Sequence, residues 1–161
     1  MRERITARVL LLDPDDRVLL MHGRLPSEPD APGAWFTVGG GAKVGESVPQ
    51  AAAREIIEET GFLDVELGPV VWYREAVYRN ARQEPILFKE SYLLARCAGG
   101  EPSRAGWQAL EKALVDDIRW WTLAEILEAV EDFYPEGFAG LLPDVLAGQV
   151  PATPRVITIA S

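Results

Sequence analysis

Three glutamates within five positions of one another are the side chains in this sequence best suited to chemistry: Glu55, Glu58 and Glu59. On a helix, these spacings place all three in one sector about 100° wide. Like charges this close destabilise an isolated helix by a few tenths of a kcal/mol per pair. A divalent cation would reverse the sign of that interaction, because carboxylate oxygens suit Mg²⁺ or Mn²⁺. For three glutamates taken alone, a solvated acidic face is the alternative interpretation.

The residues around the glutamates predict a helix over Val48–Thr60. Ser47 is a good N-cap, and Gln50 three positions later completes a capping box. Gly61 is the residue type that commonly ends a helix. Because one face presents the carboxylates, we expect the roughly opposite face to enter the core. That face comprises Ala53, Ile56, Ile57 and Thr60.

The glutamates belong to a longer pattern that runs from Gly40 to Phe62. It reads G-x5-E-x7-R-E-U-x-E-E-x-G-U, where U is a bulky apolar residue. This stretch resembles the signature of the Nudix hydrolase family, the MutT-like enzymes, at every specified position. The seven identities would occur by chance at fewer than roughly one in ten million starting points. The resemblance is therefore specific, although it covers only 23 of 161 residues.

The resemblance implies that the helix glutamates bind Mg²⁺, for which Mn²⁺ is expected to substitute, and that they carry catalysis together with Arg54 and Glu46. The carbonyl before the first motif glycine often joins the metal shell in this family, and here it belongs to Gly39. The implied metal ligands are Gly39, Glu55, Glu58 and Glu59. Arg54 is expected to pair with Glu46 and to face the incoming loop, so that the pair holds Gly39–Gly41 in register with the glutamates.

The general base stays open between a helix glutamate and an acidic residue on a later loop. Glu55 suits either the ligand role or the base role. The later candidates are Glu90, Glu111, Asp116 and Asp117. For each of these four residues taken alone, a solvated surface charge is the alternative.

The implied reaction is hydrolysis of a pyrophosphate bond in a nucleoside diphosphate linked to another group. Tyr78, sixteen residues after Phe62, resembles a tyrosine marker of dinucleoside polyphosphate hydrolases, whereas Val77 replaces the proline of many ADP-ribose enzymes. We therefore expect a nucleoside triphosphate or a dinucleoside polyphosphate as substrate. The candidate substrate-binding residues are Arg24, Trp35, Arg74 and Tyr78. A non-catalytic Nudix-fold nucleotide-sensing module is the alternative, although such proteins usually lose motif acids that this chain keeps.

Composition limits the partners. A net charge of −9 and a pI near 4.7 oppose binding to a nucleic-acid polymer. A small polyphosphate would also be repelled unless a metal ion neutralises it, and a small-nucleotide substrate is the partner that the resemblance implies. No apolar stretch approaches the 18 residues or so that a membrane span requires. Cys97 is the only cysteine, which excludes an internal disulfide. We expect a cytoplasmic protein, and a homodimer is compatible with the sequence.

Alternating strand and helix patterns predict the α/β class, and the length predicts one domain over residues 1–161, which the resemblance implies is a Nudix domain. The resemblance implies the Nudix fold, an α/β/α sandwich with a central mixed sheet. The expected strands are Ile5–Leu12, Val18–His22, Ala34–Gly39, Val65–Tyr78, Ile86–Cys97 and Ile118–Trp121. The other expected helices are Trp107–Val115, Leu123–Phe133 and Phe138–Leu146. The tail Val150–Ser161 is ambiguous.

Overall fold

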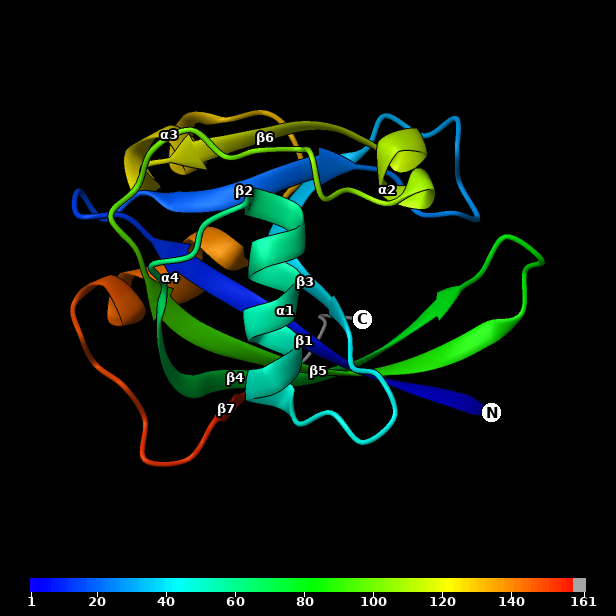
Figure 1. Cartoon of the computed structure of the whole chain (residues 1–161), viewed down its shortest axis with the longest axis horizontal. Coiled ribbons are helices and arrows are strands. Elements are labelled where there is room, and N and C mark those ends of the chain that lie inside the picture. Colours follow the sequence, from blue (N-terminus) through cyan, green and yellow to red (C-terminus); the bar gives the residue numbers. More distant parts are fainter. Residues whose placement is uncertain (158–161) are drawn as a thin grey trace.

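The structure, a computed structural model, describes residues 1–157 and places a mixed sheet of seven strands at its centre (Figure 1). The strands follow the order β6-β2-β3-β1-β5-β4-β7. Their bounds are β1 Arg2–Leu12, β2 Val18–Gly23, β3 Ala34–Gly41, β4 Glu66–Arg79, β5 Pro85–Arg96, β6 Val115–Trp121 and β7 Arg155–Val156. The helices are α1 Val48–Thr60, α2 Ala109–Leu114, α3 Leu123–Glu128 and α4 Phe138–Leu146.

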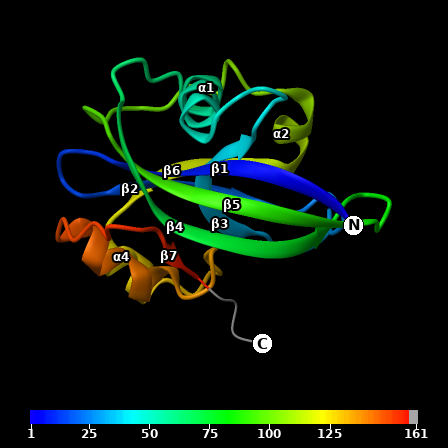
Figure 2. The same ribbon diagram turned by 90° about the horizontal axis from the view of Figure 1, so that it is seen from below.

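Helices cover both faces of the sheet, which confirms the predicted α/β/α sandwich. Figure 2 shows α1 and α2 on one side and α4 on the other, and α3 packs against α4. The sheet is mixed because β1 pairs antiparallel with β3 and parallel with β5. Among residues 1–157, no helix has the length and apolar character needed to cross a membrane.

Strand β1 separates two hydrophobic cores, because successive strand side chains point to opposite faces. Val9 and Leu11 belong to the core under α1. Leu10 and Leu12 belong to the core on the α4 side, where the Trp72 and Phe138 rings meet edge to face with centroids 6.0 Å apart. The residues of β1 that precede Val9 also point alternately to the two faces of the sheet.

The helix predicted over Leu123–Phe133 is shorter than expected and ends at Glu128. The residues that follow pair with β3 instead. The N–H of Trp35 donates to the carbonyl of Asp132 (N to O 2.8 Å), and the N–H of Tyr134 donates back to the carbonyl of Trp35 (2.8 Å). A continued helix could not supply these partners, so a non-local backbone pairing overrides the local helical pattern.

The buried face of α1 also differs from the expected one. Ile57 is half exposed, whereas Glu59 is only 4% exposed. The sheet instead receives the face made of Ala51, Ala52, Ile56, Glu59 and Thr60. The two alanines leave space for the helix to approach β1 and β3 closely. As a result, a motif glutamate enters the interior instead of facing solvent.

Candidate active site

Helix α1 begins and ends at the residues that the sequence predicts. The Ser47 hydroxyl accepts from the N–H of Gln50 (3.2 Å), and the Gln50 side-chain oxygen accepts from the N–H of Ser47 (2.9 Å). Gly61 ends the helix in a left-handed conformation with φ 75°, which glycine adopts without a steric penalty. These caps fix the register in which the helix presents its glutamates.

Arg54 connects the loop before α1 with the glutamates on the helix. Its guanidinium donates twice to Glu46, from Nε (2.8 Å) and from Nη2 (2.9 Å), and Nη2 also donates to the carbonyl of Gly41 (2.9 Å). The structure therefore shows the expected pair between loop and helix. Nη1 in addition donates to Glu55 (2.9 Å) and to Glu58 (3.2 Å). This contact with the carboxylate sector was not expected, and the planar fork of arginine makes it possible.

The carboxyl of Glu46 is held strongly in its charged form. The Arg54 guanidinium, aided by the backbone N–H of Lys43, lowers the pKa of Glu46 to about 2. The Arg54 pKa moves in the opposite direction and is raised, chiefly by its hydrogen bonds to Glu46. An ion pair that stays charged throughout the physiological pH range therefore connects the loop to the helix.

Glu59 lies against the glycine segment of β3. Its Oε1 accepts a hydrogen bond from the N–H of Gly39 (2.7 Å). Burial raises its pKa well above the ordinary value, and the neighbouring charge of Glu55 adds to the effect. The backbone of Glu59 is anchored as well, because the indole N–H of Trp107 donates to its carbonyl (2.7 Å). This carboxyl is rigidly placed, and its charged form has little compensation from the protein.

Gly39 and Gly40 have no side chain, and this allows neighbouring groups to approach β3 closely. A Cβ on Gly40 would lie 2.5 Å from Oε1 of Glu55, and a Cβ on Gly39 would lie 2.0 Å from the carbonyl oxygen of Ala7. Gly39 also has φ 137°, a conformation that other residues rarely adopt. Burial raises the pKa of Glu55, as it does for Glu59. Gly40 thus allows the Glu55 carboxylate to lie directly against β3, and Gly39 allows β3 to pair closely with β1.

The four later acidic candidates lie in different places. Glu111 on α2 raises the pKa of Glu55 and Glu59 through its charge, so it acts on the motif side of the sheet. Asp116 contacts Nδ1 of His22 (2.6 Å) and Arg24 (3.3 Å). Asp117 faces Arg104 at 3.6 Å. Glu90 points away from α1, into a cavity on the other face of the sheet.

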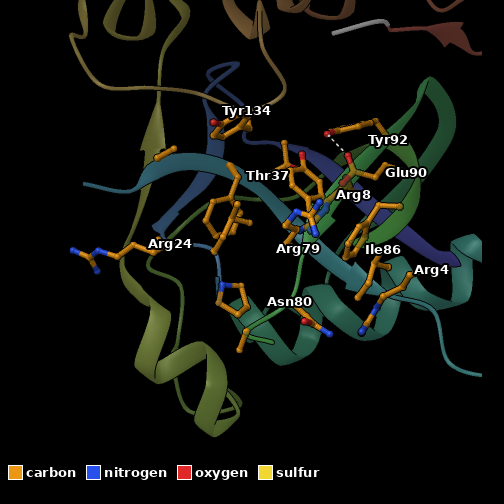
Figure 3. A pocket seen from close by; sticks show the side chains of 18 residues that line it. Arg4, Arg8, Arg24, Thr37, Arg79, Asn80, Ile86, Glu90, Tyr92 and Tyr134 are labelled. Atoms are coloured by element: carbon orange, nitrogen blue, oxygen red, sulfur yellow. Dashed lines mark hydrogen bonds between the residues drawn. The ribbon is translucent and has the colours of Figure 1, made fainter. Parts of the chain in front are cut away.

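That cavity has a volume of about 540 Å³ (Figure 3). Its floor includes Arg8, Phe88, Glu90 and Tyr92. These positions alternate along β1 and β5 with Ala7, Val9 and Leu93, which belong to the core under α1. The cavity and α1 therefore lie on opposite faces of the same strands.

Arg4 and Arg8 are cavity residues that the sequence reasoning missed. Arg8 donates from Nη1 to the carbonyl of Gly39 (3.2 Å), and the Arg4 guanidinium lies directly against Gly41. Neither arginine has an acidic partner within 4.0 Å among residues 1–157. Their even-numbered spacing on β1 was the available signal, since it puts both on one face. The backbone of Gly39 contacts side chains on both faces, because its N–H donates to Glu59 while its C=O accepts from Arg8.

The four substrate candidates are placed differently. Arg24 and Tyr78 line the cavity. Arg74 is buried behind it, within hydrogen-bonding contact of the Tyr78 hydroxyl. Trp35 is not among the lining residues. Its ring packs between His22 and Trp121 in the core, with both centroid separations 5.0 Å.

With this geometry in place, the chain can be compared with known proteins. A family model described as NUDIX domain matches residues 2–141. The chain belongs to the NUDIX family. None of the curated protein sequences compared with it gives a significant match.

Solved structures of Nudix proteins share the fold. A MutT NUDIX hydrolase from Burkholderia pseudomallei is 24% identical, covers 78% of this chain and 87% of its own, and has a TM-score of 0.50. A MutT protein from Methanosarcina mazei Go1 is 18% identical over 92% and 95%, with a TM-score of 0.60. An ADP-ribose pyrophosphatase from Streptococcus suis is 19% identical over 95% and 96%, with a TM-score of 0.59.

The Nudix glutamates suit a divalent cation by charge, although they are not gathered around one point. Within residues 1–157, no group of three or more His, Cys, Asp or Glu side chains is arranged as a metal site. Arg54 holds Glu55 and Glu58, while Glu59 turns toward Gly39. Burial and neighbouring negative charges nevertheless disfavour the charged forms of Glu55 and Glu59. A cation would offset that cost, and carboxylate oxygens are the ligands that Mg²⁺ and Mn²⁺ prefer. The donor chemistry of these residues therefore fits such an ion.

Proposed function

We propose that this protein is a Mg²⁺-dependent Nudix hydrolase that cleaves a pyrophosphate bond in a nucleoside diphosphate linked to another group. One observation carries the proposal. The buried carboxylate of Glu59 and the guanidinium of Arg8 bind the backbone N–H and the backbone C=O, respectively, of the same residue, Gly39. This arrangement supports a cation site on the α1 side of β3 next to a phosphate-attracting cavity on the other side.

Glu55, Glu58 and Glu59 would hold the cation, and Mn²⁺ is expected to substitute for Mg²⁺. The bound ion supplies charge neutralisation at phosphate oxygens and a more acidic water. Arg54 and Glu46 keep the Gly39–Gly41 backbone in register with the carboxylates. A carboxylate must take the proton from the attacking water. Glu55 and Glu111 are the candidates on the motif side of the sheet.

The cavity favours a nucleoside triphosphate or a dinucleoside polyphosphate. Arg4 and Arg8 lie next to the glycine segment, and Arg24 and Arg79 also line the cavity. Several cations in one hollow of a protein with net charge −9 favour a ligand that carries several phosphates. The aromatic rings of Phe36, Tyr78, Phe88 and Tyr134 offer apolar and stacking surface to a nucleobase.

A nucleotide-sensing module without catalysis is the second candidate. The observation in its favour is that Arg54 already occupies Glu55 and Glu58, which a cation would have to compete for. The two candidates make opposite predictions about product, because both would bind the nucleotide but only the hydrolase would cleave it.

The test is a screen of purified protein against nucleoside triphosphates, dinucleoside polyphosphates and nucleotide sugars. Each reaction is run with Mg²⁺, with Mn²⁺ and with EDTA, and products are identified by chromatography. We expect cleavage of at least one pyrophosphate bond that requires the metal. Tight nucleotide binding without product in every reaction would establish the sensor instead.

A further inference from the structure

A row of buried polar side chains crosses the sheet beneath the cavity. Strand register aligns Thr6 on β1 with Glu90 on β5, and Glu90 with Arg74 on β4. Their exposures are 1%, 3% and 1%, respectively. Of the three residues, only Glu90 lines the cavity. The polar row is therefore buried in the sheet, and Glu90 is the member of the row that a ligand in the cavity could contact.

The pairing within this row is incomplete. Nε of Arg74 lies 2.9 Å from Oε2 of Glu90, but the two are not aligned as a hydrogen bond. Nη1 of Arg74 and the hydroxyl of Thr6 also have no hydrogen-bond partner among residues 1–157. A buried ion pair stabilises a fold only when geometry and hydrogen bonding are good. Stability alone therefore gives little reason for this pair.

The two carboxylate oxygens of Glu90 have different surroundings. Oε2 faces Arg74 and accepts a hydrogen bond from the hydroxyl of Tyr92 (3.1 Å). Oε1 receives no hydrogen bond or ion pair from the part of the chain that the structure describes. Figure 3 shows the Glu90 carboxylate beside Arg8, with its bond to Tyr92 drawn. One oxygen is thus committed to the protein, and the other is available to a ligand.

The rest of the cavity indicates which part of a ligand this oxygen would meet. Glu90 is the single acidic residue among the described lining residues, which otherwise include four arginines. A phosphate would be drawn to the arginines and repelled by Glu90. The rings of Tyr78 and Phe88 lie nearby, edge to face with centroids 5.3 Å apart. They suit a planar, uncharged group.

We propose that Oε1 of Glu90 accepts a hydrogen bond from an uncharged N–H or O–H donor on the nucleoside end of the substrate, and that this contact sets substrate preference. The inference rests on the proposed function, because it takes the ligand to be a nucleotide. The donor belongs either to the base, as an amine or ring N–H, or to the ribose, as a hydroxyl. Glu90 is then a specificity-determining residue, and the general base is found elsewhere.

Wild-type protein and pairs of nucleotides that differ by one donor test the proposal. The pairs are GTP with ITP, ATP with purine riboside triphosphate, UTP with its N3-methyl analogue, and ribonucleotides with their 2′-deoxy and 3′-deoxy forms. We expect at least one pair to differ about 10-fold or more in kcat/KM, because a site built around a substrate donor rejects the analogue that lacks it. The pair that differs identifies the donor as base or ribose. Differences below about 3-fold in every pair would overturn the proposal.

Glu90→Gln sharpens the test. Its amide keeps the size of the side chain but loses the charge, so the preference should shrink to below about 3-fold. Glu75→Gln on β4 is the matched control, because Glu75 is exposed and is not a lining residue; its preference should equal that of wild type. A Glu90→Gln protein that is folded by circular dichroism and keeps the wild-type preference would contradict the assignment. If the variant does not fold, the wild-type comparison alone decides.

The same nucleotide pairs separate this proposal from the proposed function. Their binding is measured by isothermal titration in EDTA, where turnover is not required. If no nucleotide is hydrolysed but binding discriminates about 10-fold within a pair, the hydrolase proposal fails and the Glu90 proposal stands. If hydrolysis occurs but neither binding nor kcat/KM discriminates within any pair, the Glu90 proposal fails and the hydrolase proposal stands.

Discussion

Two arginine–glutamate clusters lie on opposite faces of the same sheet, and they differ in how completely they are paired. Arg54 is partly exposed and makes five hydrogen bonds, to Glu46, Glu55, Glu58 and the Gly41 carbonyl. Arg74 is buried, lies poorly aligned with Glu90, and has two nitrogens without hydrogen-bond partners among the described residues. The hydrogen-bonding groups of the partly exposed Arg54 cluster are paired, whereas those of the buried Arg74 cluster are not all paired.

This difference in pairing indicates different roles: the Arg54 cluster orders the glycine segment, and the Arg74 cluster leaves Glu90 able to contact a ligand. A partly exposed ion pair contributes little to stability, typically 0 to about 1 kcal/mol, so the value of the Arg54 cluster lies in fixing the glycine segment. Removing one partner of a buried pair costs much more, because the other charge stays buried and uncompensated. The Arg74 cluster is therefore costly to break, and its incomplete pairing leaves Glu90 able to contact a ligand.

The largest expected effect is on the stability of the buried cluster. Arg74→Met should lower the free energy of unfolding by about 3 to 5 kcal/mol, because Glu90 loses its counter-charge in the interior. Arg54→Met, the matched change on the other face, should cost less than about 1 kcal/mol. Denaturant unfolding followed by circular dichroism measures both. Equal losses would remove the distinction between the two clusters.

The next effect is on turnover at the motif side. Glu59→Gln should lower kcat at least about 100-fold, because it removes a charged ligand of an ion that contributes several kcal/mol of charge stabilisation. In EDTA the same variant should melt slightly higher than wild type, because it removes a buried like charge beside Glu55. Glu128→Gln, an exposed change on α3, is the control for both assays. Near wild-type turnover at millimolar Mg²⁺ would refute the role of Glu59.

Arg54→Lys should have a smaller effect, confined to catalysis. Lysine keeps the charge but cannot reproduce the fork that reaches Glu46 and Gly41 together. We expect kcat to fall about 10- to 100-fold, as for other residues that orient metal ligands, with a smaller change in metal affinity because the glutamates remain. Steady-state kinetics with a Mg²⁺ titration separates the two quantities. Unchanged turnover would show that the glycine segment is ordered without the fork.

The smallest effect concerns pH. Because the folded pKa of Glu46 is lowered from 4.5 to about 2, its contribution to stability is complete above pH 4.5 and is lost as the pH falls toward 2. Glu46→Gln should therefore be less stable than wild type at pH 6, and the two unfolding free energies should converge at about pH 2. Denaturant unfolding at several pH values measures the gap. A gap that does not change with pH would contradict the pairing with Arg54.

Local sequence signals were sufficient for α1, because caps and the motif spacing act within a few residues. They could not show that Glu59 enters the interior, since this depends on Ala51 and Ala52 meeting the sheet. Arg8 and Glu90 depend on strand register, which pairs them with Gly39 and Arg74 from distant parts of the chain. Helix α3 is shorter than predicted for the same reason, because the residues after α3 form backbone hydrogen bonds with Trp35.

The central claim is that the carboxylates on α1 form a divalent-cation site, and direct titration with Mn²⁺ tests it without a substrate. Electron paramagnetic resonance of free Mn²⁺ at neutral pH gives the affinity of wild type, Glu59→Gln and the control Glu128→Gln. We predict saturable binding to wild type and to the control, and an affinity at least about 10-fold weaker for Glu59→Gln. Equal binding by all three proteins, or no binding by wild type, would contradict the account.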